Sequence, residues 1–284
     1  MKECASDWKE LWAGNHVIVS NEQVASDTWK IALDAPELAS RAQAGQFLML
    51  RLPESADPLL GRPFGIFNAD AESGRLSAVY AVVGKGTRRL SQLRAGDRLE
   101  LWGPLGNGWS SAFESRGTAP KRLVLVAGGV GCVPFYLLLK EISSGARYYG
   151  ADTTFVYGAR NESRLCCLSD FKELGVDVRV VTEDGSVGAR GFVTSVLPDI
   201  LPKETPPSDV LVLACGPTPM LRAVASWTSD RGYACWTSLE SPMSCGLGLC
   251  FGCVVEELQD DGSWDYKRTC VDGPVFDAAR LKWD

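Results

Sequence analysis

Four cysteines near the carboxyl end have a spacing that can hold an inorganic cluster. Cys245, Cys250 and Cys253 lie in the pattern C-x4-C-x2-C, and Cys270 follows after a longer arm. Four thiolates at this spacing are typical of a plant-type [2Fe–2S] cluster. A four-cysteine zinc site is the alternative, but such sites more often use two short C-x2–4-C arms. The pattern therefore favours iron and sulfide over zinc.

Glycines separate these cysteines, at Gly246, Gly248 and Gly252. Because glycine has no Cβ, it adopts positive φ without strain, which lets a loop wrap tightly around a small inorganic core. The N–H groups of such a loop can point at the cluster sulfurs and help to set the reduction potential. We therefore expect all three glycines to shape the loop.

The composition limits the classes of function that are open to the chain. It has 284 residues, of which 45% are hydrophobic and 23% charged, and a formal net charge of -6. This is the balance of a globular protein of one large or two ordinary domains. The acidic balance argues against nucleic acid as the main partner, because phosphate binding needs clustered lysines and arginines. The single histidine, His16, argues against histidine-based catalysis.

The sequence predicts a cytoplasmic protein without a membrane span. No apolar run approaches the ~18 residues of a transmembrane helix, and the first residues lack the apolar core of a signal peptide. In a reducing compartment, cysteines are more often ligands or buried thiols than disulfides. We expect most of the cysteines outside the cluster pattern to be small core residues. They are Cys4, Cys132, Cys166, Cys167, Cys215 and Cys235.

The amino-terminal part has a succession of short predicted strands separated by turn residues, which is typical of an antiparallel β-barrel. After an irregular start over residues 1–14, strands are predicted at 16–20, 28–33, 47–52, 76–83 and 97–101. A helix is predicted at 88–93, opened by Gly86 and Thr87 with Thr87 as a favourable N-cap. Residues 110–120 have the composition of a linker.

Two motifs in this part could bind a phosphate-bearing ligand. Arg62 leads the run Arg-Pro-Phe-Gly at 62–65, which its proline keeps extended. An arginine in this position can pair bidentately with a phosphate while the backbone passes along a flat ring. Gly86 and Thr87 open a predicted helix, and a helix N-terminus attracts phosphate. The alternative is a plain strand, turn and helix without a ligand.

The chain changes character after residue 120. Apolar runs at 123–127 and 210–214 are typical of buried parallel strands, and further strands are predicted at 153–157, 176–181 and 233–239. Helices are predicted at 133–143, 169–174, from 192, and from Met220 to about 231. This alternation predicts a doubly wound parallel sheet with ligands at the carboxyl ends of its strands. The glycine turns at 128–131 and 215–217 lie at those ends, although the G-x-G-x-x-G fingerprint is absent.

Taken in order, these signatures resemble the ferredoxin–NADP reductase superfamily. The motifs at 62–64 and 86–87 resemble its flavin barrel, and the turns at 128–131 and 215–217 resemble its nucleotide domain. The tail from Glu240 through the cysteines to Asp-Gly-Pro-Val-Phe at 272–276 resembles the family of dihydroorotate dehydrogenase B electron-transfer subunits. The resemblance implies an FAD-binding barrel at 1–114, an NAD-binding α/β domain at 120–239 and a [2Fe–2S] cluster-binding domain at 240–284.

The same resemblance implies the site residues. FAD contacts would come from Arg62, Pro63, Phe64, Gly65, Val79, Tyr80, Ala81, Gly86 and Thr87. NAD contacts would come from Gly128, Gly129, Val130, Gly131, Cys215, Gly216 and Pro217. The cluster ligands would be Cys245, Cys250, Cys253 and Cys270. Cys215 would also shape and polarise the nicotinamide pocket, with a buried core thiol as the alternative.

Three details qualify this assignment. The flavin motif usually ends in Ser or Thr, so Gly65 lacks a hydroxyl that could bond the isoalloxazine edge. Arg160 either contacts the NAD ribose or a phosphate, or is a solvated surface arginine. The loops at 184–186 and 191–194 also resemble nucleotide-domain loops of the superfamily.

The implied function is that of an oxidoreductase subunit in pyrimidine biosynthesis. Electrons would pass from the FMN of a catalytic dihydroorotate dehydrogenase subunit through [2Fe–2S] and FAD to NAD⁺, in an assembly of two subunits of each type. A flavin is required because nicotinamide exchanges two electrons at once and the cluster one. Leu247, Leu249 and Phe251 beside the cysteines would form a docking surface for the partner, or else pack in the core.

Two other readings stay open at this point. Reductase subunits of NADH-dependent ferredoxin:NADP oxidoreductase, anaerobic sulfite reductase and cytoplasmic hydrogenase use the same three modules. A non-catalytic regulatory or zinc-structural protein that kept a degenerate reductase fold is the third hypothesis, and it predicts a colourless protein.

Overall fold

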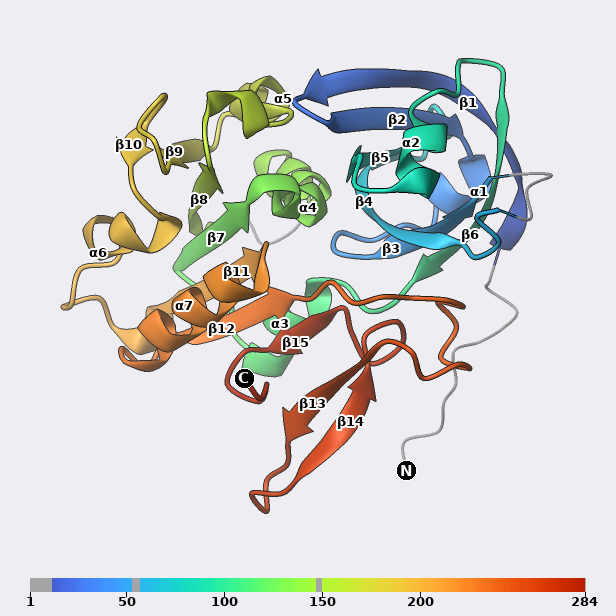
Figure 1. The fold of residues 1–284 in the computed structure, drawn as a ribbon. Helices are drawn as coiled ribbons and strands as arrows, with labels where there is room; N and C mark the ends of the chain where they lie inside the picture. The colour runs from blue at the N-terminus through green and yellow to red at the C-terminus, as the bar shows by residue number, and fades with distance from the viewer. Residues whose placement is uncertain (1–11, 53–56, 147–149, 284) are drawn as a thin grey trace.

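The computed structural model describes residues 12–52, 57–146 and 150–283, and Figure 1 shows a barrel beside an α/β sheet with a cysteine-rich segment below both. Cys4 lies outside the described residues. Six antiparallel strands close the barrel in the order β1-β2-β5-β4-β3-β6. The strands are β1 (Trp12–Ala25), β2 (Thr28–Asp34), β3 (Phe47–Arg51), β4 (Arg62–Asp70), β5 (Arg75–Ala81) and β6 (Arg98–Leu105). The barrel also carries the short helices α1 (Pro36–Ala39) and α2 (Lys85–Leu90).

The barrel strands form because apolar and polar side chains alternate along them. In β6 every second side chain is buried, from Leu99 to Leu105, which is the period of a strand with one face on a core. Ile31 and Leu33 of β2 and Leu48 of β3 fill the interior with no more than 1% of each side chain exposed. Closure leaves the six strands without a free edge.

A seven-stranded sheet follows, in the order β10-β9-β8-β7-β11-β12-β15. Its first six strands are parallel, and β15 pairs antiparallel with β12. The strands are β7 (Arg122–Gly128), β8 (Asp152–Ala159), β9 (Asp177–Thr182), β10 (Ala189–Arg190), β11 (Val210–Cys215), β12 (Ala234–Ser238) and β15 (Val275–Asp277). The helices around it are α3 (Ser110–Arg116), α4 (Val133–Ser143), α5 (Leu168–Glu173), α6 (Leu197–Ile200) and α7 (Thr218–Ser229). The predicted combination of a flavin-type barrel with a doubly wound sheet is confirmed.

The carboxyl-terminal segment is tied to both larger parts. After β12 the chain runs through the cysteine loop into the hairpin β13 (Val254–Leu258) and β14 (Trp264–Arg268), which Figure 1 shows pointing away from the barrel and the sheet. The chain then returns, and β15 becomes the edge strand of the sheet. The segment is thus anchored to the sheet beyond its last cysteine.

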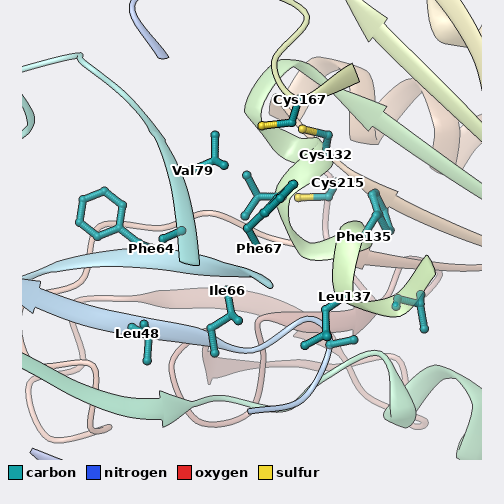
Figure 2. Packing of buried hydrophobic residues seen from close by; sticks show 14 of the residues in the cluster. Leu48, Phe64, Ile66, Phe67, Val79, Cys132, Phe135, Leu137, Cys167 and Cys215 are labelled. Carbon is teal, nitrogen blue, oxygen red and sulfur yellow. The ribbon is translucent and has the colours of Figure 1, made fainter. Parts of the chain in front are cut away.

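One apolar core joins the barrel to the sheet (Figure 2). Phe67 of β4 stacks on Tyr136 of α4 with ring centroids 4.2 Å apart. Trp109 stacks on Phe135 of the same helix at 4.9 Å, and its indole N–H donates to the Pro134 carbonyl at 2.8 Å. Continuous packing across this seam holds the two parts in one orientation.

The structure corrects several local expectations. Residues 110–116 form helix α3 instead of a linker, because Ala112 and Phe113 have apolar surface to bury. Helix α2 begins at Lys85, so Thr87 lies inside its first turn and is not the N-cap. Helix α7 begins at Thr218, two residues before the predicted start, because Pro219 is well tolerated in a first helical turn.

Strand limits also differ from the expectations. Strand β1 already includes residues 12–14, which were expected to be irregular, because they pair with β6. Beyond the strand predicted at 233–239, the sheet has one further strand, β15, which the sequence did not predict.

None of the helices in the described ranges has both the length and the apolar character that a membrane crossing requires.

Candidate functional site

A cavity of about 560 Å³ lies between the barrel, helix α4 and the chain that leaves β12. Eight of the nine residues expected to contact FAD line it, from three separate barrel segments. They are Arg62, Pro63, Phe64, Gly65, Val79, Tyr80, Ala81 and Thr87. The ninth, Gly86, lies directly behind Arg62, and a Cβ at Gly86 would be 2.2 Å from the arginine Nε. The absence of a side chain at Gly86 thus makes room for the Arg62 guanidinium beside the cavity.

The polar groups around this cavity are held by hydrogen bonds to the backbone and to a neighbouring side chain. The Thr87 hydroxyl accepts hydrogen bonds from the N–H groups of Val83 and Gly84, at 3.0 and 3.2 Å, so it fixes the turn before α2. The Tyr80 hydroxyl donates to Asn21 Oδ1 at 3.0 Å. Burial raises the pKa of Tyr80 to about 12, which keeps the phenol neutral at physiological pH. The cavity wall on this side is therefore rigid and uncharged apart from Arg62.

A second cavity, of about 580 Å³, lies at the carboxyl ends of the parallel strands. Gly128, Gly129 and Pro217 line it, together with Arg160 and the loop at 191–194. The loop at 184–186 is not part of its lining. Arg160 and Arg164 add positive charge, which suits a phosphate-bearing ligand.

The two cavities meet at the glycine turns. Val130 and Cys215 line the first cavity and not the second. Between the cavities, a Cβ at Gly131 would lie 2.3 Å from the Cys215 carbonyl oxygen, so only glycine lets the two turns touch. The same Cβ at Gly131 would also lie 2.7 Å from the Cα of Gly216. A ligand in the second cavity can therefore reach a ring in the first beside Cys215.

Cys215 is suited to shaping this junction and not to nucleophilic attack. Only 4% of it is exposed. Burial, and next the carboxyl of Glu240, raise the pKa of the Cys215 thiol well above its ordinary value, although a hydrogen bond with Ser238 opposes the shift. A neutral thiol is a weak nucleophile.

Sequence reasoning missed the polar residues at the end of β12 and directly after it. Ser238, Glu240 and Ser241 line the first cavity opposite the flavin motif. The Glu240 side chain is exposed at the cavity, and the partial desolvation of its carboxyl raises its pKa. The Ser241 hydroxyl is buried and has no hydrogen-bond partner. These residues immediately precede the cysteine loop, which was the one signal in the sequence that could have revealed them.

The absence of a hydroxyl at Gly65 has a packing reason. A Cβ at this position would lie 3.2 Å from Cγ1 of Val133, the first residue of α4. We expect Gly65→Ser to lower the free energy of unfolding by about 1 kcal/mol, as overpacking does. Urea unfolding and a titration with FAD measure the effect. The double variant Gly65→Ser, Val133→Ala should recover the loss, and a single variant as stable as the original protein would contradict this explanation.

The four cysteines of the carboxyl-terminal loop come together as two pairs. The Sγ atoms of Cys245 and Cys250 are 3.4 Å apart, and those of Cys253 and Cys270 are 3.2 Å apart. In the described part of the chain, no group of three or more His, Cys, Asp or Glu side chains is arranged to hold one metal ion. Two thiol pairs match a two-iron cluster, in which each iron takes two thiolates, better than a single tetrahedral zinc.

Backbone geometry around these thiols suits a bound cluster. Gly246 and Gly248 have φ of +71° and +77°, as expected. Gly252 does not adopt positive φ, and Phe251 does so instead at +54°, which corrects one expectation. The N–H of Gly248 donates to Cys270 Sγ at 3.2 Å.

The first and last thiols of the set differ in their environment. Burial tends to raise the pKa of Cys245, but hydrogen bonds, first from the N–H of Leu247 at 3.3 Å, lower it to about 7. Burial and the neighbouring Cys253 thiol raise the pKa of Cys270 to about 12. Metal binding requires thiolates, so loading of this loop releases protons.

The apolar residues of the loop divide into two groups. Leu247 packs against a small cluster with Phe47 and Met49 of the barrel. In contrast, 68% of Leu249 and 61% of Phe251 are exposed. Leu247 therefore packs in the core, whereas the side chains of Leu249 and Phe251 are accessible to a partner protein.

Five further cysteines lie away from this loop and are buried, as expected. They are Cys132, Cys166, Cys167, Cys215 and Cys235. None of the nine cysteines in the described ranges forms a disulfide.

Comparisons with known proteins divide the chain in the same way. Residues 15–109 match an oxidoreductase FAD-binding domain, and residues 125–226 match an oxidoreductase NAD-binding domain. Residues 240–282 match the iron-sulfur cluster binding domain of dihydroorotate dehydrogenase B. These three matches contradict the hypothesis of a non-catalytic zinc protein.

Relatives along the full length are similar too. The electron transfer subunit of dihydroorotate dehydrogenase B (NAD(+)) from Shouchella clausii is 37% identical, over 93% of this chain and 95% of the relative. The corresponding subunit from Desulforamulus reducens is 32% identical, over 92% and 95%. Among solved structures, an NADH-dependent reduced ferredoxin-NADP oxidoreductase has a TM-score of 0.79 at 29% identity, over 95% of this chain and 90% of that one. A ferredoxin NADP+ reductase from Neisseria gonorrhoeae, with a TM-score of 0.64 at 18% identity over 78% and 92%, shares the fold.

Proposed function

The chain belongs to the family of dihydroorotate dehydrogenase B electron-transfer subunits, and from this premise we propose how its residues carry electrons between a catalytic partner and NAD⁺. It is an oxidoreductase subunit with FAD-binding, NAD-binding and iron–sulfur domains. When bound, the cluster exchanges single electrons, and the flavin converts them into the hydride that NAD⁺ accepts. The proposed route runs from the FMN of the partner to NAD⁺ and serves pyrimidine biosynthesis.

One observation carries the proposal: the first cavity shares walls with both other sites. Val130 and Cys215 connect it to the NAD turns. On another side, Phe47 and Met243 line this cavity. The same two side chains also pack in the group of buried side chains that contains Cys253 and Cys270. A flavin in this cavity would lie between a nicotinamide and an iron–sulfur centre, as two-electron to one-electron conversion requires.

Each residue then has a defined task. Arg62 would pair with the FAD diphosphate, since Arg and phosphate form charge-assisted hydrogen bonds. Arg160 would bind a ribose or phosphate of NAD in the second cavity. The neutral Cys215 thiol and the Glu240 carboxyl would orient the nicotinamide over the ring and keep bulk water away from it. Cys245, Cys250, Cys253 and Cys270 would hold the cluster.

The partner's cofactor, the stoichiometry of the assembly and the cellular location are proposals that go beyond the family name. The name implies a catalytic partner subunit, and we propose that this partner carries FMN and that the assembly contains two subunits of each type. We also propose a cytoplasmic location, which the unpaired cysteines of the described residues support. The domain limits 1–114, 120–239 and 240–284 belong to the same proposal.

The absorption spectrum of the purified chain tests the cofactors. We expect flavin bands near 450 nm together with broad absorption at longer wavelengths from the cluster. A featureless visible spectrum would refute the proposal. Addition of NADH under argon should bleach the flavin bands.

A second function is favoured by one observation, the TM-score of 0.79 to an NADH-dependent reduced ferredoxin-NADP oxidoreductase. Purification of the intact complex distinguishes the two. Recovery of an FMN-containing subunit that oxidises dihydroorotate supports the main proposal. Recovery of a pyridine-nucleotide or sirohaem enzyme instead would assign the chain to another complex.

A further inference from the structure

Strand β6 and the turn after it hold both ends of the cysteine loop. The indole Nε1–H of Trp102 donates to the carbonyl oxygen of Cys245 at 3.0 Å. The side-chain amide of Asn107 donates to the carbonyl oxygens of Asp272 and Val275, at 2.9 and 3.1 Å. The first ligand and the chain just beyond the last one are thus both attached to the flavin barrel.

Asn107 makes an unusually complete set of bonds to this one segment. Its Oδ1 accepts the N–H of Val275 at 3.0 Å, and its own backbone N–H donates to the Gly273 carbonyl at 2.7 Å. The side chain thus directs three hydrogen bonds across the boundary between the barrel and the cysteine segment. An amide that supplies both donors and an acceptor cannot be replaced by a carboxylate, which only accepts.

Trp102 contacts the flavin motif as well as the cysteine loop. A Cβ at Gly61 would lie 2.3 Å from Cη2 of the indole, so the far edge of the ring is pressed against the backbone just before Arg62. Trp102 also faces Met49 across the β3 and β6 pair. One rigid side chain therefore bridges Gly61, the residue before the flavin motif, and the first cysteine.

The barrel side chains beneath the cysteine loop leave no room for the loop to move toward the barrel. A Cβ at Gly246 would lie 2.5 Å from Cγ of Met49 and 3.1 Å from Cδ1 of Leu105. Phe47, Met49 and Leu105 pack together with the buried thiols of Cys253 and Cys270. The layer between the flavin cavity and the cysteines is apolar and close-packed, so the two sites keep one separation.

We propose that Trp102 and Asn107 are positioning residues, which fix the iron–sulfur cluster relative to the flavin. This inference rests on the proposed function, since it needs both groups to be bound. The two side chains act through the backbone of the cysteine segment and touch neither group. They set the distance and the orientation across which single electrons pass, and they hinder opening of the loop.

The test compares Asn107→Asp and Trp102→Phe with the original protein. Each substitution removes N–H donors and leaves carbonyl oxygens without partners, so opening of the loop should become about tenfold more frequent. We expect release of iron to the chelator bathophenanthroline to accelerate by about that factor. The electron paramagnetic resonance signal of the reduced cluster should also change. In Asn107→Asp, FAD content and the rate of flavin reduction by NADH should be unchanged, and they report that this variant is folded.

Matched controls carry the same chemical changes elsewhere. Asn15→Asp adds a carboxylate at an exposed barrel position, and Trp227→Phe shortens a ring on α7. Both should release iron at the original rate. Iron release and resonance signals equal to those of the original protein in Asn107→Asp and Trp102→Phe would overturn the inference, as would parallel loss of FAD in Asn107→Asp. An original protein that contains flavin but no cluster would contradict the proposed function itself.

Discussion

Cys250→Ser should yield a protein that binds FAD and is reduced by NADH but contains no iron–sulfur cluster and accepts no electrons from its partner. Cys250 is exposed, so the substitution removes a ligand without disturbing a packed side chain. A serine hydroxyl is a hard and weakly acidic donor, whereas iron–sulfur clusters select soft thiolates. The loss of the cluster should therefore be complete and the loss of fold slight.

Three measurements on Cys250→Ser check this result: iron and sulfide content, the flavin absorption bands and the rate of flavin reduction by NADH. Cys235→Ser is the control, because Cys235 is buried near Thr228 and far along the sheet from the loop. That variant should keep its cluster. A full complement of iron and sulfide in Cys250→Ser would remove Cys250 from the ligand set.

The double variant Leu249→Asp, Phe251→Asp should lose the catalytic partner while keeping its cluster. Both side chains are largely exposed beside the cysteines, and the guanidinium of Arg268 lies 5.1 Å from the Phe251 ring centroid. Apolar anchors at the centre of an interface each contribute about 2 kcal/mol or more, so the affinity should fall at least about a thousandfold. Carboxylates in place of both anchors also carry the cost of burying charge.

Size-exclusion chromatography with the catalytic subunit measures the lost association, and the visible spectrum reports the cluster. Leu59→Asp serves as the control, since Leu59 is an exposed leucine in the segment before β4. It should bind the partner normally. A stable complex with the double variant would exclude the Leu249 and Phe251 surface as the docking site.

Much of the site could be predicted from local patterns. The thiol spacing requires only a short loop, and the run at 62–65 and the turns at 128–131 and 215–217 are punctuated by glycine and proline. Proline restricts the backbone, and glycine permits conformations that other residues avoid, so both can be interpreted from the sequence alone. The buried strands β7 and β11 were equally clear, because strands covered on both faces are apolar throughout.

Local patterns failed where distant packing decides the conformation. Residues 110–116 look like a linker, yet Phe113 and the neighbouring Trp109 gain so much burial that a helix forms. Thr87 has the chemistry of an N-cap, but its hydroxyl binds the backbone from inside the helix. In the loop, Phe251 and not Gly252 takes the left-handed conformation, because closure around the thiols outweighs the intrinsic preference.

The sequence by itself determined the chemistry of this protein: four thiols at a cluster spacing, a flavin motif led by Arg62, and two glycine turns after buried strands. Tertiary structure alone decided how these parts meet. It paired the thiols two by two, brought Ser238, Glu240 and Ser241 to the flavin cavity, and fastened the loop to the barrel through Trp102 and Asn107. The physical reason is that bonding chemistry belongs to single residues and short spacings, whereas the separation between sites depends on contacts between segments more than a hundred residues apart.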